Sequence, residues 1–394
     1  MTTFHQVKIG VLSETQPGER RVALVPDVAV KLVKIGFQVI VETGAGVRAD
    51  FTDDAYRKAA VAIEADRRVV LGTADVVLSV QPPRLEDVAQ LQAGALTISF
   101  LQPATQVAII GALAARGVTS FSLDLLPRSS RAQSMDALSS QSSLSGYKAV
   151  LMAANRLGKF FPMLMTAAGT IPPARVLVLG AGVAGLQAIA TARRLGAVVE
   201  AYDVRPAVQE EVKSLGARFL ELKLEIQEGE GGYAREQSED FLNRQREGLA
   251  EHVAANDVVI TTASIPGRRA PLLITAPMLK GMRRGSVIVD LAAESGGNCA
   301  ATLPGGRVVE VDGVWVDGTT NIPSTMALHA SQLYARNVTN LLQFLFSNGE
   351  LKLDFADEII RDCCVTHAGQ ITSERARQMM GVSTAQGAIR SEVR

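Results

Sequence analysis

Short apolar runs alternate with segments of helical periodicity along most of the chain. Apolar runs bounded by turn residues predict strands, and apolar positions repeated at helical spacing predict helices. The predicted strands are residues 7–12, 37–41, 76–80, 96–100, 174–179, 198–203, 257–261 and 286–291. The predicted helices are residues 26–35, 107–115, 147–157 and 324–346. This alternation is typical of βαβ units, so we expect an α/β protein with two Rossmann-like, doubly wound parallel-sheet domains separated by a cleft.

The length of the chain, 394 residues, indicates more than one hydrophobic core. The second set of strands finishes near Asn321, which leaves the last segment to return to the first domain. We therefore predict an N-terminal Rossmann-like domain of residues 1–138, completed by C-terminal helices in residues 325–394. Residues 139–324 are predicted to form a second Rossmann domain.

Composition excludes several classes of protein. Lys plus Arg and Asp plus Glu both total 40, so no net charge draws the chain to nucleic acid or to an anionic membrane. Three Cys and four His show no metal-ligand spacing, so no metal site is expected, and these few Cys fit a reducing cytoplasm. Residues 1–10 lack the features of a signal peptide, and the apolar runs are shorter than the ~20 residues that span a bilayer. We expect no direct membrane insertion.

A glycine motif follows the predicted strand at residues 174–179. Gly180, Gly182 and Gly185 form the GxGxxG pattern, in which the glycines permit a tight turn, close approach of a pyrophosphate, and close packing of helix on strand. The remaining candidate cofactor-binding residues of this turn are Ala181, Val183 and Ala184. A glycine-rich turn without a ligand is the alternative.

A carboxylate ends the next predicted strand, at Asp203, where it can accept hydrogen bonds from the adenosine ribose. Because the same carboxylate repels a 2′-phosphate, the sequence favours NAD(H) over NADP(H). Val204 and Arg205 follow it; Arg205 is interpreted more simply as an exposed surface residue than as a phosphate contact.

Two further segments follow later strands of the same domain, at the edge where such sheets bind ligands. TTASIPG contributes the candidates Thr262, Ala263, Ile265, Pro266 and Gly267, and ESGGN contributes Glu294. We interpret both as candidate walls of a nicotinamide pocket, with ordinary loops as the alternative. Residues 224–240 are polar and rich in Gly, and Tyr233 is their one large contact group. They are interpreted either as a surface insertion or as a lid over the nucleotide.

The Ser-rich segment at residues 128–146, RSSRAQSMDALSSQSSLSG, interrupts the regular pattern. On composition alone it is a solvated linker followed by a helix cap.

The chain as a whole closely resembles the NAD(H)-binding component (domain I, alpha-1 type) of the proton-translocating NAD(P) transhydrogenases, in a superfamily shared with alanine dehydrogenase. The resemblance runs from ETQPGERRVALVPD at residues 14–27 to DCCVTHAG at residues 362–369. Its most specific segments are PRSSRAQSMDALSSQS, the long stretch FPMLMTAAGTIPPARVLVLGAGVAGLQAIATA, and GGYA at residues 231–234. The resemblance implies that the Ser-rich segment is an active-site loop in which Arg128, Gln133, Asp136 and Ser139 are catalytic.

Alanine dehydrogenase differs from this chain at the residues that handle its amino acid. Its pattern has an Arg in an RVAL-like motif, which Arg21 matches. Its Lys and His motifs are SVQPP and LQPA here, with Ser79, Gln81 and Gln102 in place of those groups. Oxidation of an amino acid needs a proton-transferring group, whereas hydride exchange between two nicotinamides needs only positioning.

The resemblance therefore implies direct hydride exchange between NAD(H) bound here and NADP(H) on a partner domain. It also implies a homodimer, a separate membrane-spanning subunit that couples the reaction to proton translocation, and a cytoplasmic location at the inner face of the cell membrane through these partners. The alternatives are an alanine dehydrogenase-like amino-acid dehydrogenase and a non-catalytic NAD-sensing module. The latter would not need Arg128, Gln133 and Asp136.

Overall fold

The computed structural model describes residues 7–222, 238–264, 267–347 and 349–382. The chain divides into two compact units: a first unit up to Gln141 and again from Ser324, and a second unit, Ser142–Pro323. The predicted domain boundaries differ in placing residues 139–141 and 324 with the second domain.

The first unit is built around one mixed sheet. Its strands are β1 (Lys8–Val11), β2 (Gln38–Glu42), β3 (Ala62–Glu64), β4 (Val76–Leu78), β5 (Leu96–Ser99), β6 (Thr119–Ser122), β18 (Cys364–His367) and β19 (Gln370–Ile371). The order β3-β2-β1-β4-β5-β6 is parallel throughout, and β18 and β19 extend it antiparallel beyond β6. The C-terminal segment thus contributes strands to the first unit as well as the expected helices.

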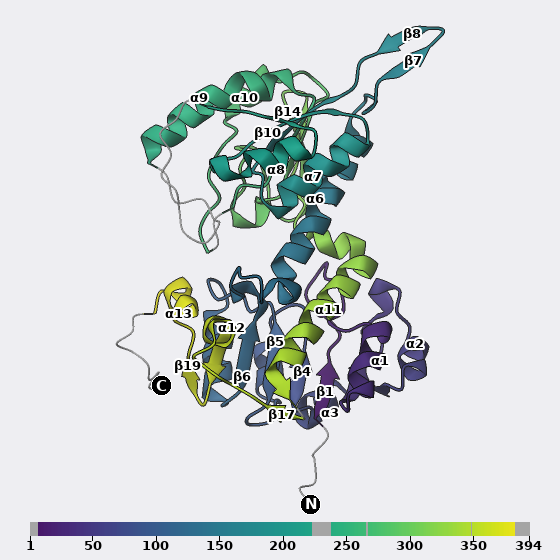
Figure 1. Ribbon diagram of the computed structural model, residues 1–394, viewed down its shortest axis with the longest axis vertical. Helices are drawn as coiled ribbons and strands as arrows, with labels where there is room; N and C mark the ends of the chain where they lie inside the picture. Colours follow the sequence, from purple (N-terminus) through teal and green to yellow (C-terminus); the bar gives the residue numbers. More distant parts are fainter. Residues whose placement is uncertain (1–6, 223–237, 265–266, 348, 383–394) are drawn as a thin grey trace, which may run out of the picture. The chain divides into compact units, whose positions relative to one another are not determined.

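Helices flank this sheet. They are α1 (Pro26–Lys34), α2 (Asp53–Lys58), α3 (Arg67–Thr73), α4 (Leu85–Val88), α5 (Val107–Ala115), α11 (Ala327–Leu345), α12 (Glu358–Cys363) and α13 (Glu374–Met380). The long helix α11 crosses the sheet and buries Tyr334 against it, as Figure 1 shows. The Tyr334 hydroxyl donates to the carbonyl oxygen of Ser79, which follows β4 (2.7 Å).

The second unit is built around the sheet β11-β10-β9-β12-β13-β15-β14, parallel except for β14. The strands are β9 (Arg175–Leu179), β10 (Val198–Tyr202), β11 (Arg218–Phe219), β12 (Val258–Thr261), β13 (Val287–Asp290), β14 (Val308–Val311) and β15 (Val314–Asp317). The helices are α7 (Val183–Arg194), α8 (Gln209–Ser214), α9 (Glu239–Ala255) and α10 (Ala276–Gly281). A hairpin of β7 (Leu164–Thr166) and β8 (Gly169–Ile171) projects from this unit (Figure 1). Helix α6 (Ala137–Arg156) begins in the first unit and ends in the second.

Both sheets have the doubly wound order 3-2-1-4-5-6, counted along each unit. Strand β9 shows why the sequence folds in this way. Val176 and Val178 pack in one apolar cluster, and the alternate residues Leu177 and Leu179 pack in another. A strand buried on both faces needs a nearly continuous apolar run, which is the pattern that predicted it. The expected α/β class with doubly wound parallel sheets is confirmed.

Two expectations about elements were wrong. The helix predicted at residues 147–157 begins at Ala137, because Asp136 caps it and Ala137 is buried. Composition also favoured a linker at residues 128–139, yet Ala132 and Met135 are buried in the core of the first unit. The polar Ser residues hid these few apolar anchors.

Candidate active site

The glycine turn connects β9 to α7 at the carboxyl edge of the second sheet. Gly180 has φ +100°, and a Cβ there would lie 2.4 Å from Thr262 Oγ1. A Cβ at Gly185 would lie 1.9 Å from the Gly180 carbonyl oxygen, so only glycine lets the helix start so close to the strand. At Gly182 a Cβ would meet nothing within 4 Å among the described residues, which leaves the side facing the helix N-terminus open for a ligand. The turn therefore fits a dinucleotide pyrophosphate.

Among the other residues of the turn, Ala181 is buried, Ala184 is half-buried and Val183 is exposed. The first turn of α7 carries no acidic residue, and no side chain in the described ranges caps its N-terminus. Its partial positive charge is thus not offset by the helix itself.

Asp203 directly follows β10 and is buried beside the glycine turn. Its Oδ2 accepts from the Ala181 N–H (2.7 Å) and from Arg205 Nη2 (2.8 Å). Its Oδ1 accepts from the Arg205 N–H (2.8 Å) and from Arg205 Nε (2.9 Å). A carboxylate has about four lone-pair positions, and four donors meet Asp203 here.

Arg205 is therefore not the exposed surface residue that the sequence suggested. Its side chain is 25% exposed and forms a two-pronged ion pair with Asp203. The guanidinium also bears on nucleotide choice, because it offsets the charge that would repel a 2′-phosphate. Val204, by contrast, packs against the apolar core of the second unit.

The segments after β12 and β13 lie at the same edge of the sheet. Thr262 donates from Oγ1 to the Gly180 carbonyl oxygen (3.0 Å), and Ala263 is bonded to the Asn298 side chain. Glu294 is exposed in a short 3-10 turn, and its Oε1 accepts from the Asn321 N–H (2.5 Å). Gly267 has φ +72°. The candidates Ile265, Pro266 and Tyr233 lie outside the described residues.

The Ser-rich segment belongs to the first unit and forms a packed turn at Gln133–Met135, followed by α6. Asp136 accepts from the Ser139 N–H (2.8 Å) and from the Ser139 hydroxyl (2.5 Å), which caps α6. Asn337 and Asn340 of α11 both donate to the Ser134 carbonyl oxygen (2.9 and 2.8 Å). Arg128 and Gln133 are exposed on this turn. The structure thus brings the four candidate catalytic residues into one short stretch of the first unit, while the glycine turn belongs to the second.

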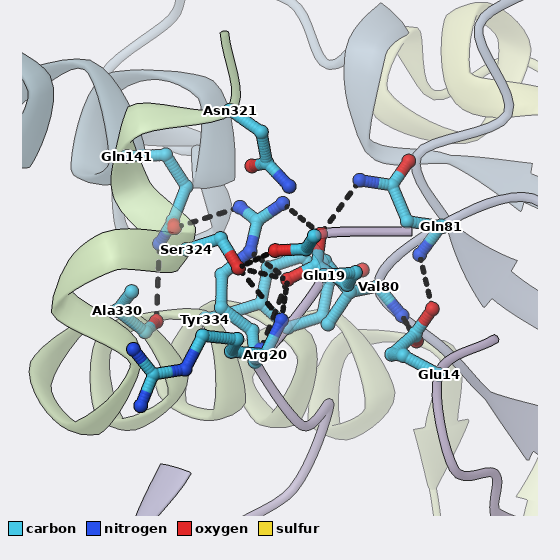
Figure 2. Close-up of polar contacts among 12 residues, drawn as sticks. Glu14, Glu19, Arg20, Val80, Gln81, Gln141, Asn321, Ser324, Ala330 and Tyr334 are labelled. Carbon is cyan, nitrogen blue, oxygen red and sulfur yellow. Dashed lines mark hydrogen bonds and ion pairs between the residues drawn. The ribbon is translucent and has the colours of Figure 1, made fainter. Parts of the chain in front are cut away.

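A buried polar network occupies the place in the first unit where the alanine dehydrogenase motifs were compared. Arg21 is buried, and its Nε and Nη2 donate to the two carboxylate oxygens of Glu19 (2.8 and 2.6 Å). Gln81 Nε2 donates to Glu19 Oε2 (2.7 Å), and Gln102 Nε2 donates to Gln81 Oε1 (3.0 Å). Figure 2 shows Gln81, Gln141 and Ser324 around Glu19. Arg21 and the two glutamines therefore do meet, and amide groups extend the ion pair.

Burial alone would raise the pKa of Glu19, but the hydrogen bonds and charge of Arg21 outweigh it and lower that pKa to about 2. Glu14 lies close by, and within the described ranges no cation contacts its carboxylate. Burial raises the pKa of Glu14 to about 8, although the Val80 N–H donates to its Oε1 (2.5 Å). The two carboxylates of one motif thus carry different charge states at neutral pH.

Sequence reasoning missed the partners that hold these groups. Glu19 stands two residues before Arg21, and Asp290 ends a buried strand; each position was a signal of a buried, bonded carboxylate. Among the described residues no cluster of His, Cys, Asp or Glu could hold a metal ion. No helix in the part of the chain that the structure describes is long and apolar enough to cross a membrane.

Comparison with known proteins assigns the family. The alanine dehydrogenase/PNT N-terminal domain matches residues 10–145, and the alanine dehydrogenase/PNT C-terminal domain matches residues 149–374. A chain of NAD(P) transhydrogenase subunit alpha from Rhodospirillum rubrum is 48% identical over 375 residues, covering 93% of this chain and 97% of the relative. The chain belongs to the NAD(P) transhydrogenase alpha subunits of the alanine dehydrogenase/PNT family.

Two solved structures agree with this family. A transhydrogenase from Sinorhizobium meliloti has a TM-score of 0.84 and 43% identity, covering 92% of this chain and 99% of that one. An L-alanine dehydrogenase has a TM-score of 0.77 and 25% identity, covering 95% and 99%. The resemblance inferred from the motifs is confirmed, and the alanine dehydrogenases share the fold at a lower identity.

Proposed function

We propose that this chain is the NAD(H)-binding subunit of a proton-translocating transhydrogenase. In this reaction hydride passes directly between NAD(H) on the second unit and NADP(H) on a partner domain. The family membership and the open glycine turn before α7 support a nucleotide site at the carboxyl edge of the second sheet.

The observation that carries the choice of reaction is the closed network around Arg21. An amino-acid dehydrogenase needs a cation for the substrate carboxylate and a group that transfers protons. Here both carboxylate oxygens of Glu19 bind Arg21, and the neighbouring side chains are the amides of Gln81 and Gln102, which do not titrate. Hydride exchange between two nicotinamides needs neither group.

The residues of this chain would bind and orient the nucleotide. Bound nicotinamide supplies the hydride chemistry. The N-terminus of α7 faces the pyrophosphate, and Asp203 accepts from the ribose after giving up one of its present donors. Thr262 and Ala263 border the nicotinamide half. Arg128, Gln133, Asp136 and Ser139 are proposed to hold the ring where its C4 meets the partner's nucleotide, since reaction rate depends steeply on that distance.

The proposed partners are a second copy of this chain, an NADP(H)-binding domain and a membrane-spanning subunit that couples the reaction to proton translocation. This places the chain in the cytoplasm at the inner face of the cell membrane through its partners.

A mixing experiment tests the proposal. The purified chain with NADH, mixed with an NADP(H)-binding transhydrogenase domain and NADP⁺, should form NADPH in a rapid single-turnover phase. Exchange that needs the chain and is abolished by removing NADH supports the proposal. NADH binding without exchange favours the NAD-sensing module, and steady turnover of alanine favours the amino-acid dehydrogenase.

A further inference from the structure

A buried carboxylate organises the turn after β13. Asp290 is fully buried, and its oxygens accept from the hydroxyls of Thr261 (2.8 Å) and Thr302 (2.6 Å). They also accept from the backbone N–H groups of Asn298 (2.7 Å) and Cys299 (3.2 Å). This carboxylate therefore fixes where the backbone of Asn298 lies.

The side chain of Asn298 joins this turn to the one after β12. It is fully buried, and its Oδ1 accepts from the Ala263 N–H (3.1 Å). Its Nδ2 donates to the carbonyl oxygens of Ala263 (2.8 Å) and Pro271 (2.8 Å). One amide thus bonds both the N–H and the C=O of Ala263, as a neighbouring strand would, and every donor of the amide is used.

Ala263 is held from its other side through the residue before it. The Thr262 N–H donates to the Leu179 carbonyl oxygen (2.8 Å), and Thr262 Oγ1 donates to that of Gly180 (3.0 Å). The glycine turn and Asn298 together leave Ala263 one position at the carboxyl edge of β12. In a doubly wound sheet a dinucleotide crosses the point where strand order reverses, here between β9 and β12.

We propose that Asn298 is a positioning residue for the nicotinamide half of the nucleotide, acting through the backbone of Ala263. The inference rests on the proposed NAD(H) site. The adenosine half depends on the glycine turn and Asp203, across β9 and β10, whereas the bonds of Asn298 go to the segments after β12 and β13. An alanine at this position leaves the Ala263 N–H and two carbonyl oxygens without their buried partner, so the segment must shift to find others.

The test compares two buried asparagines of the second unit. Asn298→Ala removes the clamp, and Asn256→Ala is the matched control. Asn256 precedes β12 at the opposite edge of the sheet, and its Nδ2 donates to Glu200 Oε1 and the His252 carbonyl oxygen (both 2.7 Å). Both variants should unfold more readily, because both lose buried hydrogen bonds.

Only the ligand affinities separate the two variants. NADH and ADP-ribose, which lacks the nicotinamide, are titrated into the wild type and each variant. We expect Asn298→Ala to weaken NADH binding about tenfold, the effect of roughly one lost hydrogen bond, and to change ADP-ribose binding less than about twofold. Asn256→Ala should change neither.

Equal losses of NADH and ADP-ribose affinity in Asn298→Ala, or no loss of either, would overturn the inference. A wild type that binds no NADH would overturn the proposed function itself, and the inference with it. If Asn298→Ala does not fold, Asn298→Ser takes its place with the same expected split. Faster hydrogen exchange at the Ala263 N–H in that variant supports the clamp, and unchanged exchange contradicts it.

Discussion

At the scale of single residues, buried carboxylates are matched by donors within their own unit. Glu19 and Asp290 are both fully buried, and each accepts several hydrogen bonds. An unpaired buried charge is costly, so the donors around each carboxylate are fixed along with it. These two side chains therefore determine the shape of the turns after β1 and β13. Glu14 differs, because the groups that the structure places on its carboxylate are backbone N–H groups and not a cation.

Glu14→Gln should make the protein more resistant to alkaline pH. Burial raises the pKa of Glu14 from 4.5 to about 8, so its contribution to stability is present below pH 4.5 and lost as pH rises through 8. Gln keeps an acceptor for the Val80 N–H and cannot ionise. Between about pH 5 and pH 9 the wild type should lose about 2–4 kcal/mol of unfolding free energy that the variant retains. Denaturant unfolding across that range measures it, with exposed Glu86→Gln as control; parallel pH profiles for wild type and Glu14→Gln would contradict it.

Asp203→Ala should change the preference between the two nucleotides. We expect NADH affinity to fall about tenfold, the typical cost of a lost charged hydrogen bond. NADPH affinity should fall less or rise, because Arg205 then lacks its carboxylate partner and can meet a 2′-phosphate. Titration of both nucleotides gives the ratio, and Glu210→Ala on α8 is a control that removes a similar charge without touching the turn. An unchanged ratio would show that Asp203 does not select the nucleotide.

At the scale of elements, the sequence predicted the strands best. The run VLVL before Gly180 is apolar at every position because both faces of β9 are covered, so its pattern was unambiguous. The start of α6 could not be predicted, since it depends on Asp136 capping and on a few apolar residues among serines. The partners of Asp203 and Ala263 also escaped prediction, because hydrogen bonds between distant loops leave no periodic signal. The glycine turn was predicted because its glycines meet steric demands of the local backbone.

The packed turn at Gln133–Met135 and the start of α6 are where a catalytic role and a structural role can be separated. Asp136→Asn keeps an acceptor for the Ser139 N–H, and Asn is a good helix cap, so folding and NADH affinity should change little. Gln133→Asn shortens an exposed side chain and should also fold. If both side chains place the nicotinamide, hydride transfer should slow about 10- to 100-fold in each variant. Stopped-flow transfer at saturating nucleotide measures this, and Ser134→Ala is a control in the same turn. Transfer at the wild-type rate in both variants would leave the segment a purely structural turn.

At the scale of the whole molecule, two units share one strand order and differ at its reversal point. In the second unit the segment after the first strand is the glycine turn. In the first unit the equivalent segment, after β1, carries Glu14 and Glu19, and carboxylates there oppose a phosphate. The nucleotide is thus expected on the second unit alone, and the first unit has to serve the reaction in another way.

The first unit could also be asked to accept an amino acid, as the shared fold with L-alanine dehydrogenase would allow. Arg21 is bound to Glu19 through two hydrogen bonds, and breaking a buried pair of this kind costs about 3–5 kcal/mol, so a substrate carboxylate competes poorly for it. Gln81 and Gln102 bring no proton-transferring group. We therefore expect no NAD⁺-dependent oxidation of alanine and no reductive amination of pyruvate by the purified chain. Absorbance of NADH with saturating alanine, or with pyruvate and ammonium, measures both directions, and a known alanine dehydrogenase run in parallel shows that the assay works. Turnover on the order of 1 to 1000 per second, the ordinary range of enzymes, would mean that Glu19 releases Arg21 and that the chain is an amino-acid dehydrogenase.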